Sequence, residues 1–564
     1  MAMDGLTLRA IVDELQTALV GGKVQKSQQP KKDEIILNIY NNKNNYKLLI
    51  NSNAENYRIN LTKHSYENPK QAPLFCMLLR KHIDSGKITK IEQPGLERVV
   101  KIFISSRDEL GNPVEKVLIC ELMGKHSNLI LANAETHKII DAVKRVPFGV
   151  SRVRQILPGF SYTKPPTTKK SILNDMVELS SSNFASSLVD SFTGISPLIA
   201  RELAHRYNDY YEAIAFIKDI IAEKNYEPSI TKSKLGKMWC GVLPYTHLAS
   251  DFESYSNMNN AMDEFYYIKT TTKQFNSYKQ DLLKVCNKSL SKNKRTLEKQ
   301  LKDLKGAEKA EKYKHTADLI KANLYQIKGG LERVEVIDYF DPELKPIIIK
   351  LDPHKSPNKN LTSLYKKYEK AIRTKENLTS RVTKNRLEID YLESIITLIN
   401  TSLVLTDLEQ IKLELIEEGY IEPPKQKKGK KPKKQEVKVS QPRQYLSADG
   451  FIIEVGRNNR QNDHLSLKKA HKEDIWFHTK DIPGSHVVIR SKGAEVSENT
   501  LLLAANLAAF FSKAKSSANV PVDYTTVKRV FKQRGAHPGQ VLYTHQRTLY
   551  VTPNEKLIPE EVVK

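Results

Sequence analysis

The feature that most constrains the fold is a leucine that recurs every seven residues in the middle of the chain. The repeat consists of Leu283, Leu290, Leu297 and Leu304. A second apolar series follows after a short break, at Ala371, Leu378, Val382, Ile389, Leu392, Ile396, Ile399 and Leu403. Such spacing is typical of helices that pack along one seam, so we predict an antiparallel coiled-coil hairpin. An arm of ~65 helical residues would reach ~100 Å at 1.5 Å per residue.

The break between the two arms has the signals of a small β structure. Residues 335–340 and 347–351 are rich in β-branched and aromatic side chains and flank Asp341-Pro342. We therefore predict a coiled-coil middle domain over 256–420 with a β tip at about 331–357. The polar face of the arms is rich in lysine. Such a face is usually only solvated, and the alternative is a basic rod that runs along RNA.

The N-terminal part, 1–170, alternates helix and strand signals. A helix is predicted where Leu8, Ile11, Val12, Leu15 and Leu19 share one face, and the glycines at 21 and 22 end it. Strand-like segments follow at 34–40, 46–51, 57–61, 99–104, 116–122 and 128–131, with a second helix near 74–83. This pattern predicts an α+β domain whose strands mostly pair with sequence neighbours. The proline-rich segment 158–166 marks its end.

Residues from about 171 to 250 are expected to form short helices. The segment 193–203, TGISPLIAREL, is similar to the second half of a helix-hairpin-helix motif. In that motif the N–H groups of the turn hold a phosphate without reading the base sequence. An ordinary helix start with proline in its first turn explains the same residues equally well.

The C-terminal part has a linker and a compact domain. The linker, 421–442, begins with a proline pair and has seven lysines between Lys425 and Lys434. It is expected to be a disordered tether that adds salt-sensitive attraction to phosphate. Residues 443–564 are predicted to form an α+β unit with a turn at Asp449-Gly450 and a buried helix over 498–511. Its predicted strands lie near 445–446, 451–455, 476–478, 486–489, 525–531, 541–543 and 549–551.

The balance of charges predicts a polyanionic partner. The chain has 90 Lys and Arg against 65 Asp and Glu, a formal net charge of +25, which suits nucleic acid or an acidic membrane surface. The most apolar stretch, 501–511, is shorter than a membrane span, and neither a signal peptide nor an anchor is recognisable. The four cysteines are widely separated, which suits a reducing compartment. We expect a cytoplasmic protein without a membrane partner.

Few residues have the pattern of a reaction centre. The sequence has no Walker loop, no G-x-G-x-x-G and no H-E-x-x-H. His478 and His486 share one segment, 474–489, but no cysteine or carboxylate cluster completes a metal site. We therefore predict no catalytic residue, no metal and no cofactor. The segment instead suits RNA binding by stacking and phosphate contact, with one of Trp476 and Phe477 facing inward and the other outward.

Five motifs together resemble the NFACT family. They are ELMGKHSN (121–128), RVRQILPG (152–159), KYKHTADLIKANL (312–324), LDPHKSP (351–357) and DIWFHTKDIPGSHVVI (474–489). The resemblance covers the whole chain in the family's order. It implies an α+β multidomain protein with a glycosylase-like NFACT-N domain (1–170), a helix-hairpin-helix domain (171–255), the coiled coil and a C-terminal NFACT-R RNA-binding domain (443–564).

The resemblance also implies a function in ribosome quality control. Members bind the large ribosomal subunit, through its RNA and stalk base, while it still holds a stalled peptidyl-tRNA and nascent chain. They recruit tRNA, chiefly alanine tRNA, and promote template-free alanine tailing, which marks the nascent chain for degradation. The ribosomal peptidyl transferase centre makes the bond, so no catalytic centre is expected here.

Two other functions are compatible with the family's history and fold. Bacterial members were first described as fibronectin-binding proteins, so a surface-exposed fibronectin-binding adhesin is the main alternative. A DNA glycosylase is suggested only by the shape implied for the first domain. Those enzymes use an N-terminal proline nucleophile, whereas this sequence begins Met1-Ala2-Met3-Asp4, so base excision is not expected.

The family motifs nominate particular residues. Members carry an Asp-Arg pair needed for tRNA binding, and this sequence has Glu97-Arg98 there, with the acid one methylene longer. Further tRNA-binding candidates are Lys125, His126, Arg152 and Arg154, with Lys144 and Arg145 as weaker ones. In the C-terminal domain the RNA-binding candidates are Arg457, Asn458, Trp476, His478, Lys480, Ser485 and His486.

Overall fold

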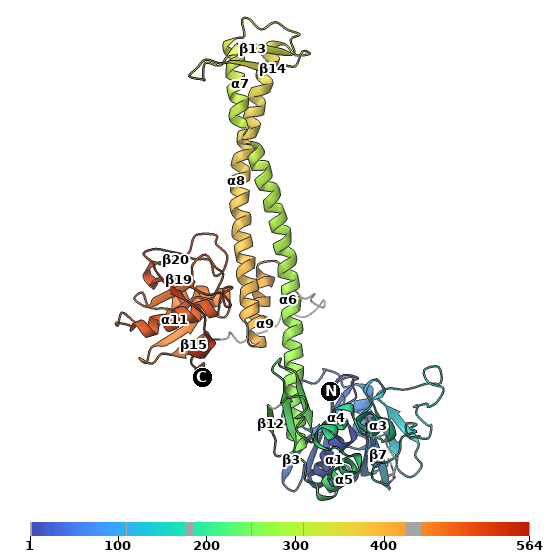
Figure 1. The fold of residues 1–564 in the computed structure, drawn as a ribbon. Coiled ribbons are helices and arrows are strands. Elements are labelled where there is room, and N and C mark those ends of the chain that lie inside the picture. The colour runs from blue at the N-terminus through green and yellow to red at the C-terminus, as the bar shows by residue number, and fades with distance from the viewer. Residues whose placement is uncertain are drawn as a thin grey trace. The chain divides into compact units, whose positions relative to one another are not determined.

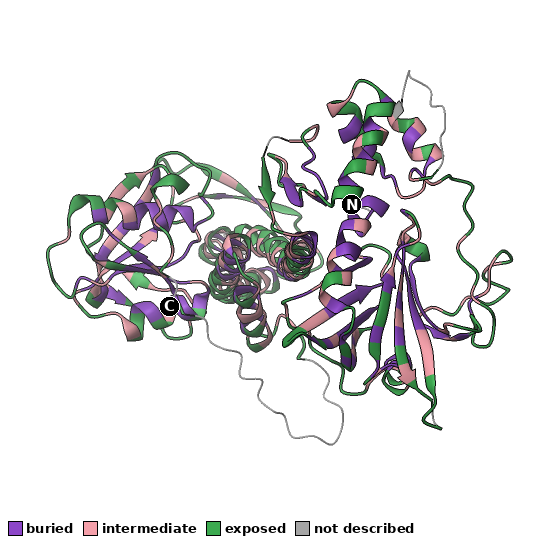
Figure 2. Ribbon diagram, turned by 90° about the horizontal axis from the view of Figure 1, so that it is seen from below, coloured by how far each residue is buried: buried purple, intermediate pink, exposed green. Residues whose placement is uncertain are grey.

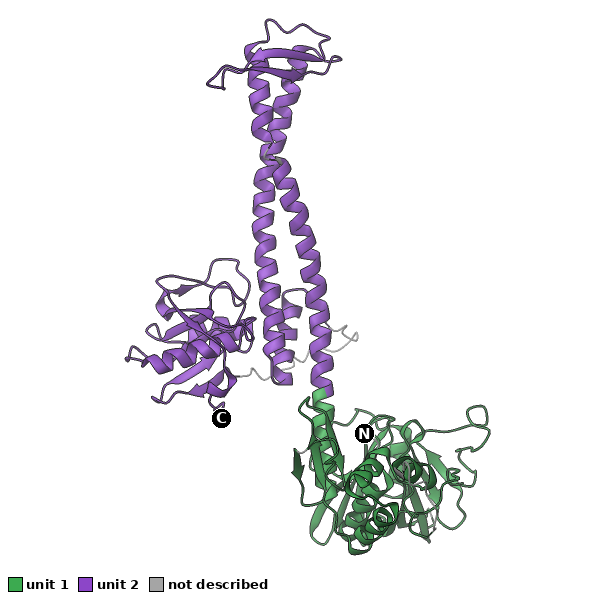
Figure 3. Cartoon of the chain, in the orientation of Figure 1, with its two compact units in different colours: residues 1–272 green, residues 273–564 purple. Residues whose placement is uncertain are grey.

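The chain divides into two compact units, residues 1–272 and 273–564 (Figure 3). The computed structural model describes residues 3–108, 110–174, 184–249, 251–307, 309–423 and 441–562. Most of the predicted lysine-rich linker, 424–440, lies outside these residues. The segments predicted as two domains, 1–170 and 171–255, contribute side chains to one continuous hydrophobic core in the first unit.

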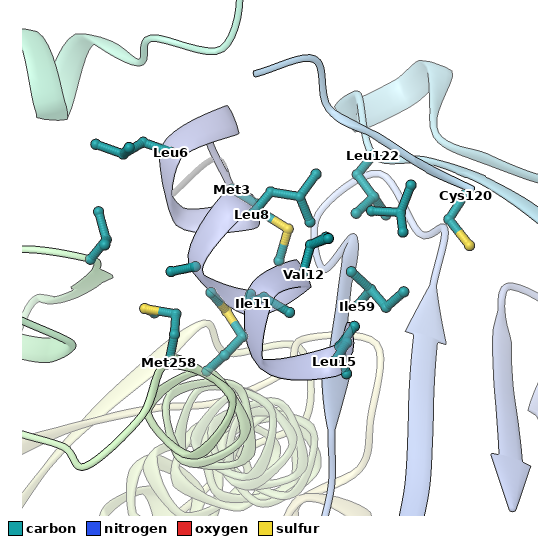
Figure 4. Close-up of a cluster of buried hydrophobic side chains, with 14 of the residues drawn as sticks. Met3, Leu6, Leu8, Ile11, Val12, Leu15, Ile59, Cys120, Leu122 and Met258 are labelled. Atoms are coloured by element: carbon teal, nitrogen blue, oxygen red, sulfur yellow. The ribbon is translucent and has the colours of Figure 1, made fainter. Parts of the chain in front are cut away.

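The first helix, α1 (Gly5–Leu19), lies at the centre of that core. Asp4 begins it by accepting a hydrogen bond from the backbone N–H of Thr7 at 2.8 Å. Most of its residues are buried (Figure 2). Leu8 and Val12 point toward Leu122 (Figure 4). The predicted helix is therefore confirmed, and it begins three residues before the first residue of the apolar pattern.

A nine-stranded antiparallel sheet packs around α1, in the order β4-β3-β2-β1-β5-β6-β7-β8-β9. The strands are β1 (Lys23–Lys31), β2 (Glu34–Asn41), β3 (Asn44–Asn51), β4 (Arg58–Leu61), β5 (Lys87–Glu92), β6 (Val99–Arg107), β7 (Pro113–Glu121), β8 (Asn128–Asn133) and β9 (Ile139–Ala142). The six predicted strands are confirmed, mostly paired with sequence neighbours. The two meanders, β1–β4 and β5–β9, join where Lys23 faces Lys87.

Shorter elements complete the first unit. The helices are α2 (Leu74–His82), α3 (Phe184–Ser191), α4 (Pro197–Arg206) and α5 (Tyr210–Glu223), with a 3-10 turn η1 (Gly124–His126). Three strands, β10 (Ser229–Lys232), β11 (Met238–Gly241) and β12 (Phe252–Ser254), form a separate sheet in the order β11-β10-β12. The expectation that residues from about 171 to 250 are helical is thus wrong over its last part, which contains β10 and β11. Each of these strands has only three or four residues, too few for an alternating pattern to be visible in the sequence.

The long helix α6 (Met258–Ala307) begins against α1. The carboxylate of Glu14 accepts the backbone N–H of Met258 at 2.6 Å and that of Asn259 at 2.9 Å. Next to it, Asp263 accepts the backbone N–H of Lys63 at 2.9 Å. Glu14 thus satisfies two N–H groups at the positive end of the helix dipole, and α6 is fixed to the core of the first unit.

Replacing Glu14 by alanine tests this attachment. We expect the first turn of α6 to fray and the free energy of unfolding to fall by about 1–2 kcal/mol, because two helix N–H groups lose a charged acceptor. Chemical denaturation and hydrogen exchange at Met258 and Asn259 measure both effects. Glu135→Ala, which removes the same charge from an exposed turn, is the control. Unchanged exchange at the two amides would contradict the assignment.

The second unit contains a helical rod (Figure 1). Its elements are the part of α6 after residue 272, α7 (Ala310–Ala322), β13 (Arg333–Ile337), β14 (Pro346–Lys350), α8 (Pro357–Thr401) and α9 (Leu405–Glu417). α6 and α8 lie side by side, and the paired strands β13 and β14 form the tip. The predicted hairpin with a β tip is confirmed. The first arm is not one continuous helix, because α6 ends at Ala307 and α7 begins at Ala310.

Along most of the rod the buried residues are those of the heptad pattern, and near the base further residues are buried as well. The four heptad leucines of α6 are half-buried, as expected for a two-helix seam. On α8, Tyr391, Ile395 and Leu398 lie outside the predicted seam and are nevertheless buried. They pack against Leu408 and Ile411 of α9. A third helix therefore covers the other side of α8 at this end.

The C-terminal domain is a six-stranded antiparallel sheet, in the order β15-β16-β18-β17-β19-β22, with α11 packed on one face. Its strands are β15 (Arg443–Leu446), β16 (Ile452–Val455), β17 (Ile475–Thr479), β18 (Val487–Ile489), β19 (Val520–Thr526) and β22 (Arg547–Val551). β20 (Val530–Phe531) pairs with β21 (Leu542–Tyr543) apart from this sheet. The remaining elements are α10 (Asn459–His464), the π-helical turn η3 (Leu465–Lys469), α11 (Glu498–Phe510), η4 (Val527–Arg529) and η5 (Glu555–Leu557).

This domain contacts the base of the rod through buried polar groups. Arg443 is 2 % exposed and pairs with Asp407 of α9 at 3.2 Å. Glu414 of α9 is also buried, and its Oε1 accepts from the Tyr391 hydroxyl at 2.9 Å and from Nδ2 of Asn459 at 3.2 Å. Burial raises the pKa of Glu414 to about 7. The contact therefore contains a carboxyl group that is neutral in mildly acidic solution.

The sign of this shift predicts how stability depends on pH. Below pH 4.5 the carboxyl is protonated in both the folded and the unfolded chain. As the pH rises toward 7, only the unfolded chain ionises, so folding becomes less favourable by up to ~3 kcal/mol. Glu414→Gln keeps the accepting oxygen and removes the titration. We expect the variant to gain ~1–3 kcal/mol over the wild type at pH 8 and little at pH 5, in thermal unfolding at both values. An equal difference in stability between variant and wild type at pH 5 and pH 8 would refute this prediction.

Candidate nucleic-acid interface

Glu97 and Arg98 line a pocket of about 370 Å³ in the first unit. They lie between β5 and β6, and Asp4, which directly precedes α1, lines the same pocket. The remaining wall comes from Met123, from 165–167 and Lys169, and from the segment that leads into α4. The structure thus brings the predicted Glu-Arg pair together with the predicted helix-hairpin-helix turn, although about a hundred residues separate them.

Two helix starts meet in this pocket. Asp4 caps α1, and its second oxygen accepts from the Ser196 hydroxyl at 2.8 Å. Ser196 in turn caps α4 by accepting from the backbone N–H of Ile199 at 3.3 Å. Burial raises the pKa of Asp4, while the hydrogen bonds and the charge of Arg98 oppose this. The turn is thus a capped helix start with proline in its first turn, and phosphate contact there stays a prediction.

Close packing of backbone holds the two segments together. The N–H of Gly5 donates to the carbonyl of Gly194 at 2.7 Å. Gly194 has a φ of +80°, and a Cβ on it would lie 2.0 Å from the Leu96 carbonyl oxygen. Only glycine fits this position. The wall of the pocket is therefore fixed by main chain, directly before Glu97.

Arg98 is held in place at both its ends. Its carbonyl accepts from the backbone N–H of Leu122 at 2.8 Å, which ties it to the end of β7. Its guanidinium faces the hydroxyl of Tyr57. Burial raises the pKa of Tyr57 and the positive charge of Arg98 opposes that shift. A half-buried guanidinium at the rim of a pocket is suited to a phosphate or a base edge.

Three other candidates of the first unit are exposed near this pocket. Lys125 and His126 are on η1, directly after β7, and Arg152 is in the loop that follows β9. Lys144 is different, because its Nζ donates to the carbonyls of Ser52 at 2.6 Å and Ser127 at 2.9 Å. Lys144 therefore stabilises the end of η1 through hydrogen bonds to main-chain carbonyls.

Arg154 has a structural role in this geometry. Its side chain is 13 % exposed and forms a two-pronged ion pair with Glu121, which is 1 % exposed. Its Nε also donates to the carbonyl of Thr163 at 2.6 Å, and the guanidinium lies 5.1 Å from the centre of the Tyr162 ring. These contacts occupy its donors. RNA contact through Arg154 stays a prediction, and we interpret the residue chiefly as an anchor for the loop that carries Arg152.

A pair of variants separates structural from exposed arginines. Arg154→Ala leaves the Glu121 carboxylate buried without its charge partner, so the free energy of unfolding should fall by about 3 kcal/mol or more. Arg145→Ala is the matched control, because Arg145 also pairs with a carboxylate but is 51 % exposed. It should cost clearly less than Arg154→Ala, because solvent reaches the Arg145 guanidinium. Urea denaturation measures both, and equal losses would contradict the interpretation.

In the C-terminal domain the aromatic candidates are interior residues. Trp476 and Phe477 are both 0 % exposed, so the expectation that one of them faces outward is wrong. The reason is that β17 lies inside the sheet, with α11 over Phe477 and a second apolar cluster around Trp476 on the opposite face. The sequence alone does not distinguish a strand that is buried on both faces from a strand with one face exposed to solvent.

His486 belongs to the same interior network, and the half-buried ring of His478 packs against Trp476 and His486. Nε1 of Trp476 donates to the Ser466 hydroxyl at 3.0 Å, and that oxygen lies 2.7 Å from Nδ1 of His486. Burial lowers the pKa of His478 to about 4 and that of His486 well below its ordinary value. Both rings are therefore neutral at physiological pH.

The other C-terminal candidates also divide by exposure. Arg457 pairs with Asp407 at 3.4 Å and with Glu561, and Asn458 caps α10 and donates to Gln410 at 2.7 Å. Ser485 is buried. Lys480, at the end of β17, is exposed and is the candidate best placed to reach a ligand. RNA binding by this set stays a prediction.

The sequence reasoning missed the residues that build the pocket around Arg98. Asp4, Ser196 and Lys169 line it, Tyr57 faces the Arg98 guanidinium, and the four come from distant segments. Asp4 and Ser196 each precede a helix by one residue, a signal that identifies a helix cap. Nothing in that signal shows that the two caps face one another.

A metal centre or a membrane span would be a different kind of functional element. Among the described residues, no three His, Cys, Asp or Glu side chains form a group that could hold a metal ion. In the same part of the chain, none of the helices is long and apolar enough to cross a membrane.

Fold and site together define a class of protein: a mixed α+β chain with a large antiparallel sheet, a long helical hairpin, a pocket lined by an arginine and a second sheet domain. Residues 4–435 match the family model for the NFACT N-terminal and middle domains, and residues 441–545 match that for the NFACT protein RNA binding domain. The chain therefore belongs to the NFACT family.

Relatives are similar over nearly the full length. The chain is 37 % identical to the Rqc2 homolog RqcH of Bacillus subtilis (strain 168), over 98 % of each chain. It is 35 % identical to the Rqc2 homolog RqcH of Streptococcus pneumoniae serotype 2, over 99 % of each chain. A solved structure, the N-terminal part of the fibronectin/fibrinogen-binding protein from Streptococcus suis, is 30 % identical, with a TM-score of 0.42, and covers 47 % of this chain and 99 % of its own.

Proposed function

We propose that this chain is a ribosome quality control factor. Its membership in the NFACT family and its full-length similarity to proteins named Rqc2 homolog RqcH support this role. The net charge of +25 agrees with an RNA partner. An RNA-binding family of this kind has no reaction centre among its known features, and the proposal assigns this chain none.

In detail, we propose that the protein binds the large ribosomal subunit while a stalled peptidyl-tRNA is still attached. It recruits tRNA, chiefly alanine tRNA, and promotes addition of alanine to the nascent chain. The ribosomal peptidyl transferase centre supplies the chemistry, so the protein contributes binding and positioning alone. Its site of action is the cytoplasm. In this proposal the protein has a glycosylase-like first domain and a helix-hairpin-helix domain. No base excision activity is assigned to it.

The observation that carries the proposal is the pocket at Arg98. The family's tRNA-binding pair falls there, in the form Glu97-Arg98, beside the start of α4. Lys125, His126 and Arg152 add exposed donors nearby. Such donors hold phosphates and fix the position of an RNA without reading its sequence, and the fork of Arg98 adds a directional contact. In the C-terminal domain, Lys480 is proposed to contact RNA on a surface supported by Trp476, Ser485 and His486.

The adhesin alternative rests on the names of similar structures. The Streptococcus suis protein is named a fibronectin/fibrinogen-binding protein. A strongly basic chain also adheres to acidic matrix through charge alone. Fractionation of intact cells distinguishes the two functions, because an adhesin would be recovered at the surface and a ribosome factor with the ribosomes.

Arg98→Ala tests the proposed tRNA site. We expect recovery of tRNA with the purified protein to fall about tenfold or more and alanine tails on stalled chains to be lost, because the guanidinium that lines the pocket is removed. Binding of the large subunit should largely remain, because the rod is unchanged. RNA sequencing of copurified material and mass spectrometry of stalled chains provide the readouts.

Two variants control this experiment. Arg107→Ala removes an exposed arginine from the opposite end of the same strand, β6, and should leave tRNA recovery unchanged. Arg98→Lys keeps the charge without the fork, and should recover only part of the binding. Wild-type tailing by Arg98→Ala would refute the role of Arg98. Failure of the wild-type protein to enrich large-subunit RNA or alanine tRNA over a charge-matched protein would refute the function itself.

A further inference from the structure

The segment after β9 combines positive charge with exposed apolar side chains. Residues 142–174 contain seven lysines and arginines and no aspartate or glutamate. Within it, four apolar side chains are more than half exposed: Phe148 (67 %), Val150 (73 %), Val153 (79 %) and Phe160 (51 %). Arg152 lies among them and is exposed as well. Exposed apolar groups gathered on one loop commonly mark a binding surface.

The fold holds this loop in a defined shape. Val146 and Ile156 exchange two backbone hydrogen bonds of 2.9 Å, which close residues 146–156 into a ring. Inside it, the N–H groups of Val150 and Ser151 donate to the Pro147 carbonyl at 2.9 and 3.2 Å. Arg154 anchors the ring through its ion pair with Glu121. The exposed side chains are thus presented by an ordered turn.

Phe160 is fixed beside the same loop. Its carbonyl accepts from the backbone N–H of Ile139 in β9 at 2.8 Å, and Gly159 returns a bond of 2.8 Å to the Ile139 carbonyl. The chain around this ring is therefore attached to the edge of the large sheet. Residues 146–160, called the aromatic loop from here on, are held at both ends.

The aromatic loop lies close to the pocket at Arg98. Glu121, which binds Arg154, is the last residue of β7, and the next residue, Leu122, is bonded to the carbonyl of Arg98. Glu97 is close enough to Tyr162 for its charge to act on the phenol. An RNA that enters the pocket would therefore pass beside the exposed rings.

We propose that the aromatic loop binds unpaired nucleotides of an RNA, with Phe148 and Phe160 stacking on bases and Arg152 contacting phosphate. Unpaired bases expose the flat faces that such rings accept, whereas paired bases bury them within the helix. The absence of acidic residues over 142–174 matches a phosphate backbone and disfavours a basic protein partner. The inference rests on the proposed function, because it assumes an RNA ligand.

Fluorescence of a modified hairpin RNA tests the proposal. The full-length protein is titrated with a hairpin that carries 2-aminopurine in its loop, and with a blunt duplex as the paired control. We expect the wild type to quench the loop base and to prefer the hairpin. Phe148→Ala and Phe160→Ala should each weaken hairpin binding by about tenfold and reduce the quenching, with little effect on the duplex. Phe252→Ala, an exposed phenylalanine of β12, is the control.

Conservative variants separate stacking from simple apolar contact. Phe148→Tyr keeps an aromatic face and should bind as the wild type, whereas Phe148→Leu keeps apolar area without that face and should lose the quenching. If Phe148→Leu retained full binding and quenching, or if the alanine variants behaved as the wild type, the proposal would be overturned. A wild-type protein that bound hairpin and duplex equally would overturn it too. Thermal unfolding of each variant confirms that these exposed substitutions leave the fold intact.

The outcome for the loop is independent of the outcome for the proposed function. Cosedimentation of the same proteins with large ribosomal subunits tests the function. A wild type that binds subunits, combined with alanine variants that bind the hairpin normally, would refute the loop assignment alone. A wild type that prefers and quenches the hairpin but ignores ribosomal subunits would refute the function and leave the loop as an RNA-binding surface.

Discussion

The first unit depends on one buried carboxylate, that of Asp4. It begins α1 by binding Thr7 and joins that helix to the start of α4 through Ser196. A buried negative charge is costly unless donors surround it. Here the Thr7 N–H and the Ser196 hydroxyl donate to the carboxylate, and the positive charge of Arg98 acts on it as well. The same groups that stabilise the acid also form the pocket. The stabilisation of the buried acid and the shape of the pocket thus depend on the same residues.

Much of the architecture follows from patterns in the sequence. The leucines from Leu283 to Leu304 identify one arm of the rod because a two-helix seam repeats every seven residues. β5 and β9 were not predicted, but β2, β3, β4, β6, β7 and β8 were equally visible. β1 was not, since its sequence KVQKSQQPK is mostly polar, and its pairing comes from its neighbours. Tyr391 and Leu398 were missed because α9, a separate helix, covers them.

The candidate site was only partly predictable, for a physical reason. Arg98, Lys125 and Arg152 are exposed or half-exposed, as a binding role requires. Trp476 and His486 look like ligand-binding residues in the sequence, because aromatic and polar side chains alternate there. In the structure both side chains are hydrogen-bonded to the hydroxyl of Ser466 inside the domain. A local motif cannot show whether its side chains complete a core or contact a ligand.

The antiparallel pairing of α6 with α8 makes the length of the rod a joint property of two segments far apart in the sequence. An insertion of seven residues in α6 alone would keep its own seam but would move it about 10 Å past its partner. The register would survive only if α8 gained a matching heptad. The rod can therefore change length only if both arms gain or lose the same number of heptads. A change in its length during evolution thus requires paired insertions or deletions in two distant segments of the sequence.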